Sequence, residues 1–239
     1  MNINDKELID NKQEINNAET KTDEKEINTE ESMKDKKINE IKDEINKSLN
    51  EFENLVTKKN KNKNIFIEHL ANGHNFIKWM IKKYKLQFGP SPAMVFKNEI
   101  FYCRLGVNIG CEQGDEQGQY DKRPVLILQN DKGNSSSTTT IIAPITTHDG
   151  TIEEMEFDFN GVKIKKFVIK HEQGIKKLDY YEIPVGLEPG YKKEIKGYIN
   201  LAQIRTISKK RLEKEPVAKI NSTTKNKIDK SIKKLLSMN

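Results

Sequence analysis

Beyond residue 98 the sequence is a succession of short β-rich runs whose connections are too short to hold helical crossovers. Parallel strands that follow one another need such crossovers, so these runs are expected to pair mostly as antiparallel neighbours. The three strongest runs, residues 100–106, 124–129 and 139–147, are rich in β-branched and aromatic residues and are bounded by Gly, Asn, Asp or Ser clusters. The stretch 99–147 therefore predicts a small antiparallel sheet around which the rest of the chain is organised.

Four further runs complete a predicted set of about seven strands. Residues 153–159 and 162–170 flank Asn160-Gly161, a two-residue hairpin signal because both residues tolerate positive φ. Residues 180–185 and 198–207 follow. Ser208 is expected to cap a short turn, and Ser222 to cap a terminal helix. The helix residues expected to face the sheet are Ile228, Ile232, Leu235 and Leu236. The predicted fold class is mainly β, a small barrel with a C-terminal helix.

The chain before residue 90 reads as helical. Residues 1–35 are polar and aperiodic and are predicted to form a disordered acidic tail. Residues 36–90 form a predicted helical extension, ended by Gly89 and two prolines, and residues 91–239 form the barrel domain. An apolar stripe at helical spacing runs along the first helix, and packing on the body is the favoured explanation over a second copy or another protein. His74, on the apolar face of a second helix at 65–86, is expected to be a packed histidine rather than a ligand.

Charge separates the two ends of the chain. Residues 1–56 hold 9 Lys against 16 Asp and Glu, whereas the remainder carries 33 Lys and Arg against 20 Asp and Glu. A basic body of this kind is typical of proteins that meet a polyanion such as nucleic acid. No apolar run is long enough to span a membrane and no signal peptide is recognisable, so an intracellular protein is expected. Cys103 and Cys111 are interpreted as reduced thiols.

Polar residues gather at the ends of the predicted strands. Arg123 stands before a proline at the mouth of the second strand, Glu112 and Gln113 lie in the loop before it, and Thr146 closes the third strand. In an antiparallel sheet these positions can meet at one rim. We therefore expect a cation, a carboxylate and a hydroxyl to converge there.

Five sequence blocks around these residues occur in a characteristic order. They are Gly106-x-Asn108-x-Gly110-x-Glu112-Gln113, Arg123-Pro124-Val125-Leu126-Ile127, Gln129-Asn130-Asp131, Ala143-Pro144-Ile145-Thr146, and Gln203-Ile204-Arg205-Thr206-Ile207-Ser208 with Arg211-Leu212. Together they resemble the MazF/PemK family of toxin endoribonucleases. The resemblance implies an SH3-like, MazF/CcdB-like barrel in a cytoplasmic homodimer. It also implies cleavage of single-stranded RNA without a metal or cofactor, and neutralisation by a cognate antitoxin.

The same resemblance assigns roles to individual residues. Arg123 matches the arginine of acid–base work and phosphate stabilisation, Thr146 the threonine that supports the transition state, and Glu112 the acidic residue that orients groups at the site. Attack by the RNA 2′-hydroxyl needs a proton acceptor, a proton donor and positive charge at the phosphate, and a guanidinium and a hydroxyl suit the last of these tasks. The expected RNA contacts are Asn108, Gln113, Asn130, Asn134, Ser136, Thr147 and His148.

Three alternatives remain open from the sequence. His148 lies two residues beyond Thr146 and has the pKa that proton transfer prefers, so a histidine-based ribonuclease is a competing hypothesis. A toxin directed at DNA gyrase on the same barrel is a second, and a non-catalytic RNA-binding module is a third. Two departures from the compact family pattern are a loop lengthened by residues 115–121 and an apparent insertion at 148–179.

Overall fold

The computed structural model describes residues 33–58, 62–92, 94–108, 110–115, 122–172, 174–191 and 194–238. It divides the chain into two compact units, Met1–Gly73 and His74–Asn239. The predicted acidic tail at 1–35 lies outside the described residues up to residue 32, and so does most of the lengthened loop at 115–121.

The first unit contains a helix over residues 33–56 and the start of α2 (Lys63–Gln87). Asn62 caps α2, because its side-chain oxygen accepts a hydrogen bond from the backbone N–H of Asn64 at 3.0 Å. A Cβ at Gly73 would lie 2.4 Å from Cγ1 of Val56, so the missing side chain allows the two segments to touch.

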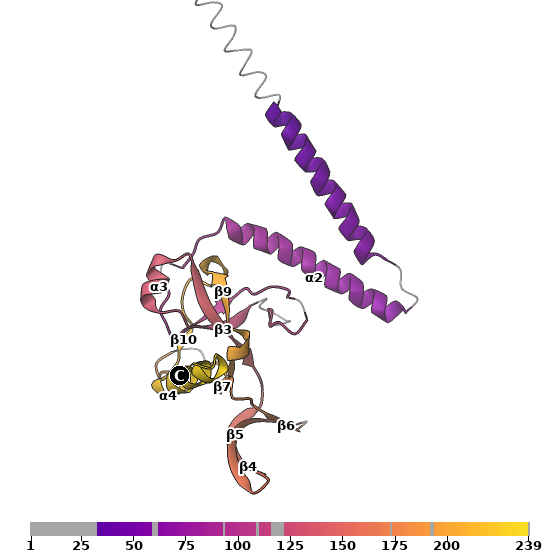
Figure 1. The fold of residues 1–239 in the computed structure, drawn as a ribbon. Coiled ribbons are helices and arrows are strands. Elements are labelled where there is room, and N and C mark those ends of the chain that lie inside the picture. The colour runs from indigo at the N-terminus through magenta and orange to yellow at the C-terminus, as the bar shows by residue number, and fades with distance from the viewer. Residues whose placement is uncertain are drawn as a thin grey trace, which may run out of the picture. The chain divides into compact units, whose positions relative to one another are not determined.

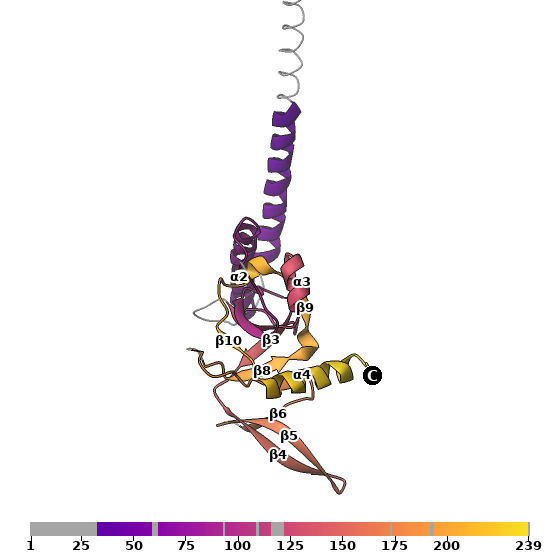
Figure 2. The same cartoon turned by 90° about the vertical axis from the view of Figure 1, so that its left-hand side faces the viewer.

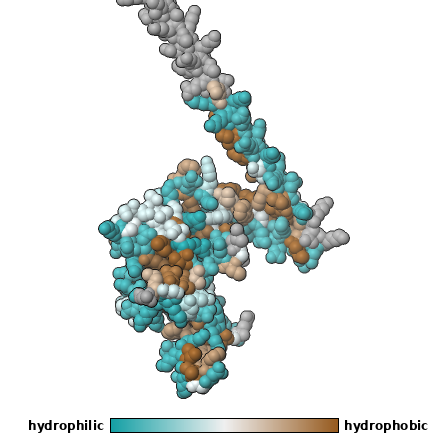
Figure 3. Space-filling view, in the orientation of Figure 1, coloured by the Kyte–Doolittle hydropathy of each residue, from teal (hydrophilic) through white to brown (hydrophobic). Residues whose placement is uncertain are grey.

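The apolar stripe of the first helix is exposed. Ile38 is 48% exposed and Leu55 is 61% exposed, and brown side chains along this helix are visible in Figure 3. The predicted packing of this stripe on the body stays a prediction. His74, predicted to be packed, is also exposed, because the buried side of this part of α2 is occupied by Trp79.

The second unit is built on one curled antiparallel sheet in the order β10-β1-β2-β3-β8-β7, with β9 also paired to β3. The antiparallel pairing predicted from the short connections is confirmed. Its strands are β1 (Glu99–Cys103), β2 (Arg123–Ile127), β3 (Thr139–Thr147), β7 (Glu182–Pro184), β8 (Gly197–Asn200), β9 (Arg205–Ser208) and β10 (Ala218–Lys219).

One bend and one short bridge turn this sheet into a barrel-like body. The predicted single strand at 198–207 is broken by η1 (Leu201–Gln203), where the Asn200 side chain accepts a hydrogen bond from the N–H of Ala202. As a result β8 pairs with one end of β3 and β9 with the other. The two outer edges of the sheet are joined where Leu187 bridges Ile220. The predicted mainly-β, barrel-like class is confirmed.

A smaller sheet, β4-β5-β6, occupies the region interpreted as an insertion. It consists of β4 (Thr151–Phe159), β5 (Val162–His171) and β6 (Gly174–Lys177), and it extends away from the main sheet in Figures 1 and 2. The turn between β4 and β5 has φ values of 54° at Asn160 and 80° at Gly161, which confirms the predicted hairpin. Strand β6 was not predicted.

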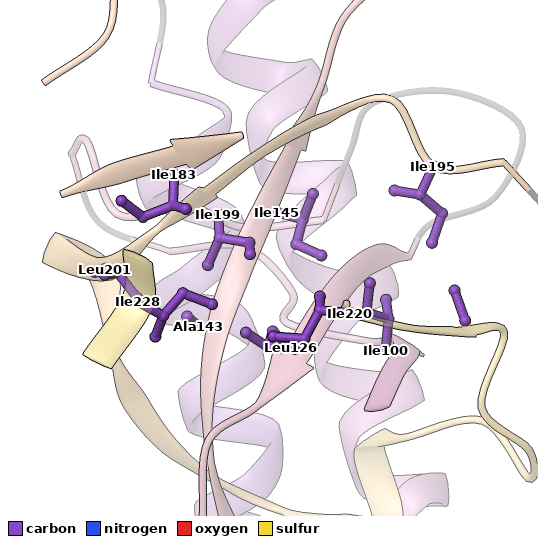
Figure 4. Close-up of a cluster of buried hydrophobic side chains, with 11 residues drawn as sticks. Ile100, Leu126, Ala143, Ile145, Ile183, Ile195, Ile199, Leu201, Ile220 and Ile228 are labelled. Carbon is purple, nitrogen blue, oxygen red and sulfur yellow. The ribbon is translucent and has the colours of Figure 1, made fainter. Parts of the chain in front are cut away.

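The helix α4 (Ser222–Leu235) seals one face of the main sheet. Its Ile228 packs into a cluster with Leu126, Ile145 and Ile199, drawn in Figure 4. The expected cap at Ser222 is wrong by one residue, because the Asn221 side chain accepts the N–H of Thr224. Leu236, expected to face the sheet, is 60% exposed because α4 ends at the residue before it.

The opposite face of the main sheet carries a second apolar cluster that includes Phe101, Val125 and Ile142. Two short helices flank it. The helix α3 (Asp131–Ser136), capped by Asn130, was not predicted. The short helix η2 (Lys209–Arg211) is capped by Ser208, as expected. This second face is the one that leads to the candidate site.

Candidate active site

Arg123 and Thr146 lie on the same face of the main sheet. Arg123 begins β2, and its side chain shares a face with Val125, two residues further along. Val125 pairs with Pro144 of β3, and Thr146 follows Pro144 by two residues. Both Arg123 and Thr146 are half-buried rather than sealed in the core. The structure therefore brings together the cation and the hydroxyl that the sequence placed at one rim.

The loop between β1 and β2 connects these two side chains. Arg123 Nε donates a hydrogen bond to the carbonyl oxygen of Gly114 at 2.6 Å, and its Nη1 donates to the carbonyl of Ile145 at 3.2 Å. Gln113 Nε2 donates to Thr146 Oγ1 at 2.7 Å. The guanidinium is thus fixed both to the loop and to the backbone beside Thr146.

The loop is held in a defined shape by its own hydrogen bonds. The N–H of Asp115 donates to the carbonyl of Gly106 at 3.0 Å, and the Asp115 carboxylate accepts the N–H of Leu105 at 2.6 Å. Asn108 Nδ2 donates to the carbonyl of Gln113 at 2.8 Å. A Cβ at Gly114 would lie 2.4 Å from the Gly106 carbonyl oxygen, so the two parts of the loop approach closely only because residue 114 is glycine.

Arg205 and Gln203 complete the cluster, although sequence reasoning did not select either as a site residue. Arg205 Nη2 donates to the carbonyl of Gln113 at 2.5 Å, and the Gln203 side-chain oxygen accepts the N–H of Gln113 at 3.3 Å. Both residues belong to the last of the five sequence blocks, which was the available signal. They reach the rim because η1 turns the chain between β8 and β9.

The electrostatics of the rim are those of two neighbouring guanidinium groups and one carboxylate. Burial lowers the pKa of Arg205, the charge of Glu112 raises it, and the nearby charges of Arg211 and Arg123 lower it. Glu112 itself is exposed. It immediately precedes Gln113, whose side chain contacts Thr146. Two cations held side by side form a site that favours an anion.

His148 lies beside this cluster but in a different environment. Its ring stacks against Tyr198 at a centroid distance of 6.4 Å and meets His171 edge-on at 6.0 Å. Burial and the neighbouring His171 lower its pKa, which the contacts of Gly150 and Asp149 partly offset. Both ring nitrogens are buried. This geometry does not favour His148 as the proton-transfer group of the competing hypothesis.

The remaining expected RNA contacts do not gather at the rim. Asn130 caps α3 and Ser136 ends it, and this helix follows the end of β2 opposite Arg123. Asn134 is 3% exposed: its Nδ2 donates to the Gln129 carbonyl at 2.9 Å, and its Oδ1 accepts from Thr140 Oγ1 at 2.8 Å. Its side chain is thus committed to internal contacts.

Thr147 lies next to Thr146, and its side chain points to the other face of β3 because successive side chains of a strand alternate. Of the expected RNA contacts, Asn108 and Gln113 lie in the loop at the rim.

Metal ions require sets of ligating side chains, chiefly His, Cys, Asp and Glu. Within the described part of the chain no three His, Cys, Asp or Glu side chains are grouped to hold a metal ion. Both cysteines are free thiols; Cys103 is buried next to Arg123 in the sheet, and its burial raises its pKa, whereas Cys111 is exposed. Among the described helices, none combines the length and apolarity needed to cross a membrane.

The fold is that of a small β-barrel protein in which an arginine and a threonine side chain lie on one face of the sheet, joined by the loop between β1 and β2. The model of the PemK-like, MazF-like toxins of type II toxin–antitoxin systems matches residues 96–236, more than half of the chain. The chain belongs to this family.

The chain is also similar to individual proteins. The chain is 36% identical over 127 residues to endoribonuclease MazF of Staphylococcus epidermidis, a match that covers 53% of this chain and 82% of the relative. Among solved structures, it is similar to Form-I MazF from Deinococcus radiodurans, with 14% identity, a TM-score of 0.41 and coverage of 61% and 98%. An endoribonuclease from a Mycobacterial species in complex with its cognate antitoxin gives 16% identity, a TM-score of 0.37 and coverage of 62% and 97%.

Proposed function

We propose that this toxin is a sequence-specific, metal-independent endoribonuclease that cleaves single-stranded RNA at the rim formed by Arg123 and Thr146. The observation that carries the proposal is the convergence of these two side chains on one loop, where Gln113 contacts Thr146, Gly114 contacts Arg123, and Arg205 contacts the Gln113 backbone. The 36% identity to a protein named endoribonuclease MazF supports the reaction class.

The chemistry of the site fits attack by the 2′-hydroxyl of the substrate. The 2′-oxygen bonds to phosphorus as its proton leaves, and the bond from phosphorus to the 5′-oxygen breaks as that oxygen gains a proton. The products are a 2′,3′-cyclic phosphate and a 5′-hydroxyl end. The negative charge that develops on the non-bridging oxygens of the phosphate faces the guanidinium of Arg123 and the hydroxyl of Thr146, which stabilise it more strongly than bulk water does.

In this proposal Arg205 positions the loop, and Glu112 adjusts the charge of the site. The Arg205 guanidinium holds the backbone of Gln113, and the Glu112 carboxylate offsets part of the positive charge. Asn108 and Gln113 are the RNA contacts that the geometry supports best. For Asn134, whose side chain is buried, we assign a structural role instead.

The surroundings of the enzyme follow from the family. Members are toxins of toxin–antitoxin systems, which supports a cognate antitoxin as partner and the cytoplasm as the place of action. We further propose a homodimer formed through the barrel. Residues 91–239 would then be the toxin domain, with 36–90 as its extension.

The direct test is cleavage of single-stranded RNA by the purified full chain in excess chelator. The wild type is expected to leave 2′,3′-cyclic phosphate ends, and Arg123→Ala and Thr146→Ala are expected to remove the activity. Thr206→Ala, an exposed threonine on β9, is the matched control and should cleave normally.

Three outcomes would overturn the proposal. Intact RNA with the wild type, when the protein inhibits DNA supercoiling, would indicate a gyrase-directed toxin. Salt-dependent binding of RNA without cleavage would indicate a binding module. Undiminished cleavage by both variants would move the catalytic site elsewhere.

A further inference from the structure

The one tryptophan of the chain, Trp79, is buried against the barrel although most residues of its helix are exposed. Trp79 is 8% exposed, whereas its neighbours Met80 and Ile81 are 47% and 53% exposed. All three belong to the part of α2 that lies in the second unit. The indole is therefore the side chain through which this end of the helical extension is anchored to the barrel.

The indole contacts the backbone of Gly106 directly. A Cβ built on Gly106 would lie 2.0 Å from Cε2 of Trp79 and 2.3 Å from its Cζ2, distances that no real side chain tolerates. Gly106 also has a φ of +83°, which L-residues rarely adopt. Residue 106 must therefore be glycine for two reasons: its positive φ and its close contact with the ring of Trp79.

Gly106 in turn carries the loop that holds the catalytic pair. Its carbonyl accepts the N–H of Asp115 at 3.0 Å and lies against Gly114. Gly114 accepts the hydrogen bond from Arg123 Nε, and the preceding Gln113 donates to Thr146. From Trp79 to the catalytic groups there are thus two steps: ring to Gly106, and Gly106 to the segment 113–115.

A second contact of the Trp79 ring stabilises the same part of the loop. The Arg211 guanidinium lies 5.4 Å from the centroid of the Trp79 ring, and its Nη1 donates to the carbonyl of Leu105 at 3.1 Å. The ring is therefore held between Gly106 and a cation that itself grips the loop. In addition, Lys210 Nζ hydrogen-bonds the carbonyl of Gln87 at the end of α2.

We propose that Trp79 is a positioning residue for RNA cleavage, through which the helical extension sets the conformation of the catalytic loop. This rests on the proposed function, because the reaction is the one assigned to Arg123 and Thr146. Trp79 touches neither of them. Removing the ring leaves Gly106 free to move, so segment 113–115 no longer holds the guanidinium and the hydroxyl at a fixed separation.

Kinetics of three full-length variants provide the first test. Trp79→Ala is expected to lower kcat at least about tenfold with little change in KM for RNA, since a displacement of about 1 Å can cost about 100-fold in rate. Trp79→Phe keeps a ring against Gly106 and is expected to restore most of the rate. Met80→Ala, at an exposed position of the same helix, should match the wild type.

A second test needs no activity. Hydrogen exchange of the amides of Leu105 and Asp115, both bonded within the loop, is expected to accelerate in Trp79→Ala and to stay unchanged in Met80→Ala. Gly106→Ala should do the same. Gly161→Ala is its control, because Gly161 has a φ of +80° but open space around a Cβ, so it adds backbone strain without a clash.

The two tests separate the possible failures. If the wild type does not cleave RNA, the proposed function is wrong, and the exchange experiment still decides whether Trp79 orders the loop. If Trp79→Ala keeps the wild-type kcat, or if its loop amides exchange at the wild-type rate while the protein remains folded, the positioning role is refuted. Equal loss of kcat in Trp79→Phe, with normal exchange, also contradicts it.

Discussion

The two faces of the main sheet are built from the same strands but have different ends. On the face covered by α4, Leu126 pairs with Ala143 and Ile145 pairs with Ile199, and all four belong to one buried apolar cluster. On the other face, the apolar residues Val125 and Ile142 give way along the same strands to arginine and threonine. One face is closed by a helix, and the other opens at a polar rim.

This difference shows how a small barrel combines stability and chemistry. Burial of apolar side chains on the closed face stabilises the fold, and the polar residues of the rim are not needed for this. The rim then holds charged groups at half burial, where electrostatic interactions are stronger than in water but the charges are still solvated. Substitutions on the two faces should therefore separate into effects on stability and effects on rate.

Arg123→Ala should have the largest effect and act on rate alone. Loss of the guanidinium is expected to lower kcat by about 10³-fold, about 4 kcal/mol, because the fixed donors to the phosphate disappear. Arg123→Lys keeps the charge but not the planar fork, and should recover only part of the loss. Single-turnover cleavage measures the rate of each variant, and thermal unfolding measures its stability. Full activity in Arg123→Lys would show that charge alone suffices.

Ile199→Ala tests the closed face. Ile199 is fully buried between Ile145 and Ile183, so its truncation should lower the free energy of unfolding by about 3 kcal/mol. The rate per folded molecule should remain near the wild type. Urea unfolding measures the first quantity, with Ile141→Ala, a partly exposed isoleucine of β3, as the control that should cost much less. A selective loss of kcat in Ile199→Ala would contradict the separation of the two faces.

Asn134→Ala tests the assignment of a buried amide to structure rather than to RNA. Its side chain satisfies the Gln129 carbonyl and the Thr140 hydroxyl, so removal should cost about 2 kcal/mol of stability. KM for RNA should not change. Exposed Ser135 on the same short helix is the control, and Ser135→Ala should change neither quantity. A raised KM in Asn134→Ala at unchanged stability would restore the RNA-contact hypothesis.

The smallest effect is expected from pH. The pKa of His148 is lowered from its ordinary 6.5 chiefly by burial. The unfolded chain therefore takes up a proton at a higher pH than the folded chain, so stability is complete above pH 6.5 and declines as the pH falls below it. His148→Phe should lessen the decline in Tm between pH 7 and pH 5.5, whereas His69→Phe, at an exposed position of α2, should leave it unchanged. An identical decline in all three proteins would exclude His148 as its source.

Much of the barrel could be predicted from local patterns. Strand β3 has the predicted bounds, and the Asn160-Gly161 turn adopts the positive φ values that its residues permit. Three of the errors share one physical cause. The break at Asn200, the cap at Asn221 and the short helix after Asn130 all depend on one side chain meeting a backbone N–H, which periodicity does not register.

The candidate site was predictable in part. Arg123 and Thr146 stood at strand ends in the sequence, and antiparallel pairing then places strand ends at a common rim. Arg205 was missed as a site residue because it lies 82 positions from Arg123 and reaches Gln113 only through the turn at η1. The sequence placed Trp79 in a helix, but nothing in its local sequence indicates that the ring contacts Gly106.

The sequence by itself determined which residues form strands, where the polar strand ends fall and that the body is basic, because these depend on side-chain type and spacing along the chain. Only the tertiary structure decided which loop carbonyls hold Arg123, that Arg205 joins the rim, and that the ring of Trp79 rests on Gly106. Those contacts join residues far apart in the chain, and their formation depends on the curl and closure of the whole sheet.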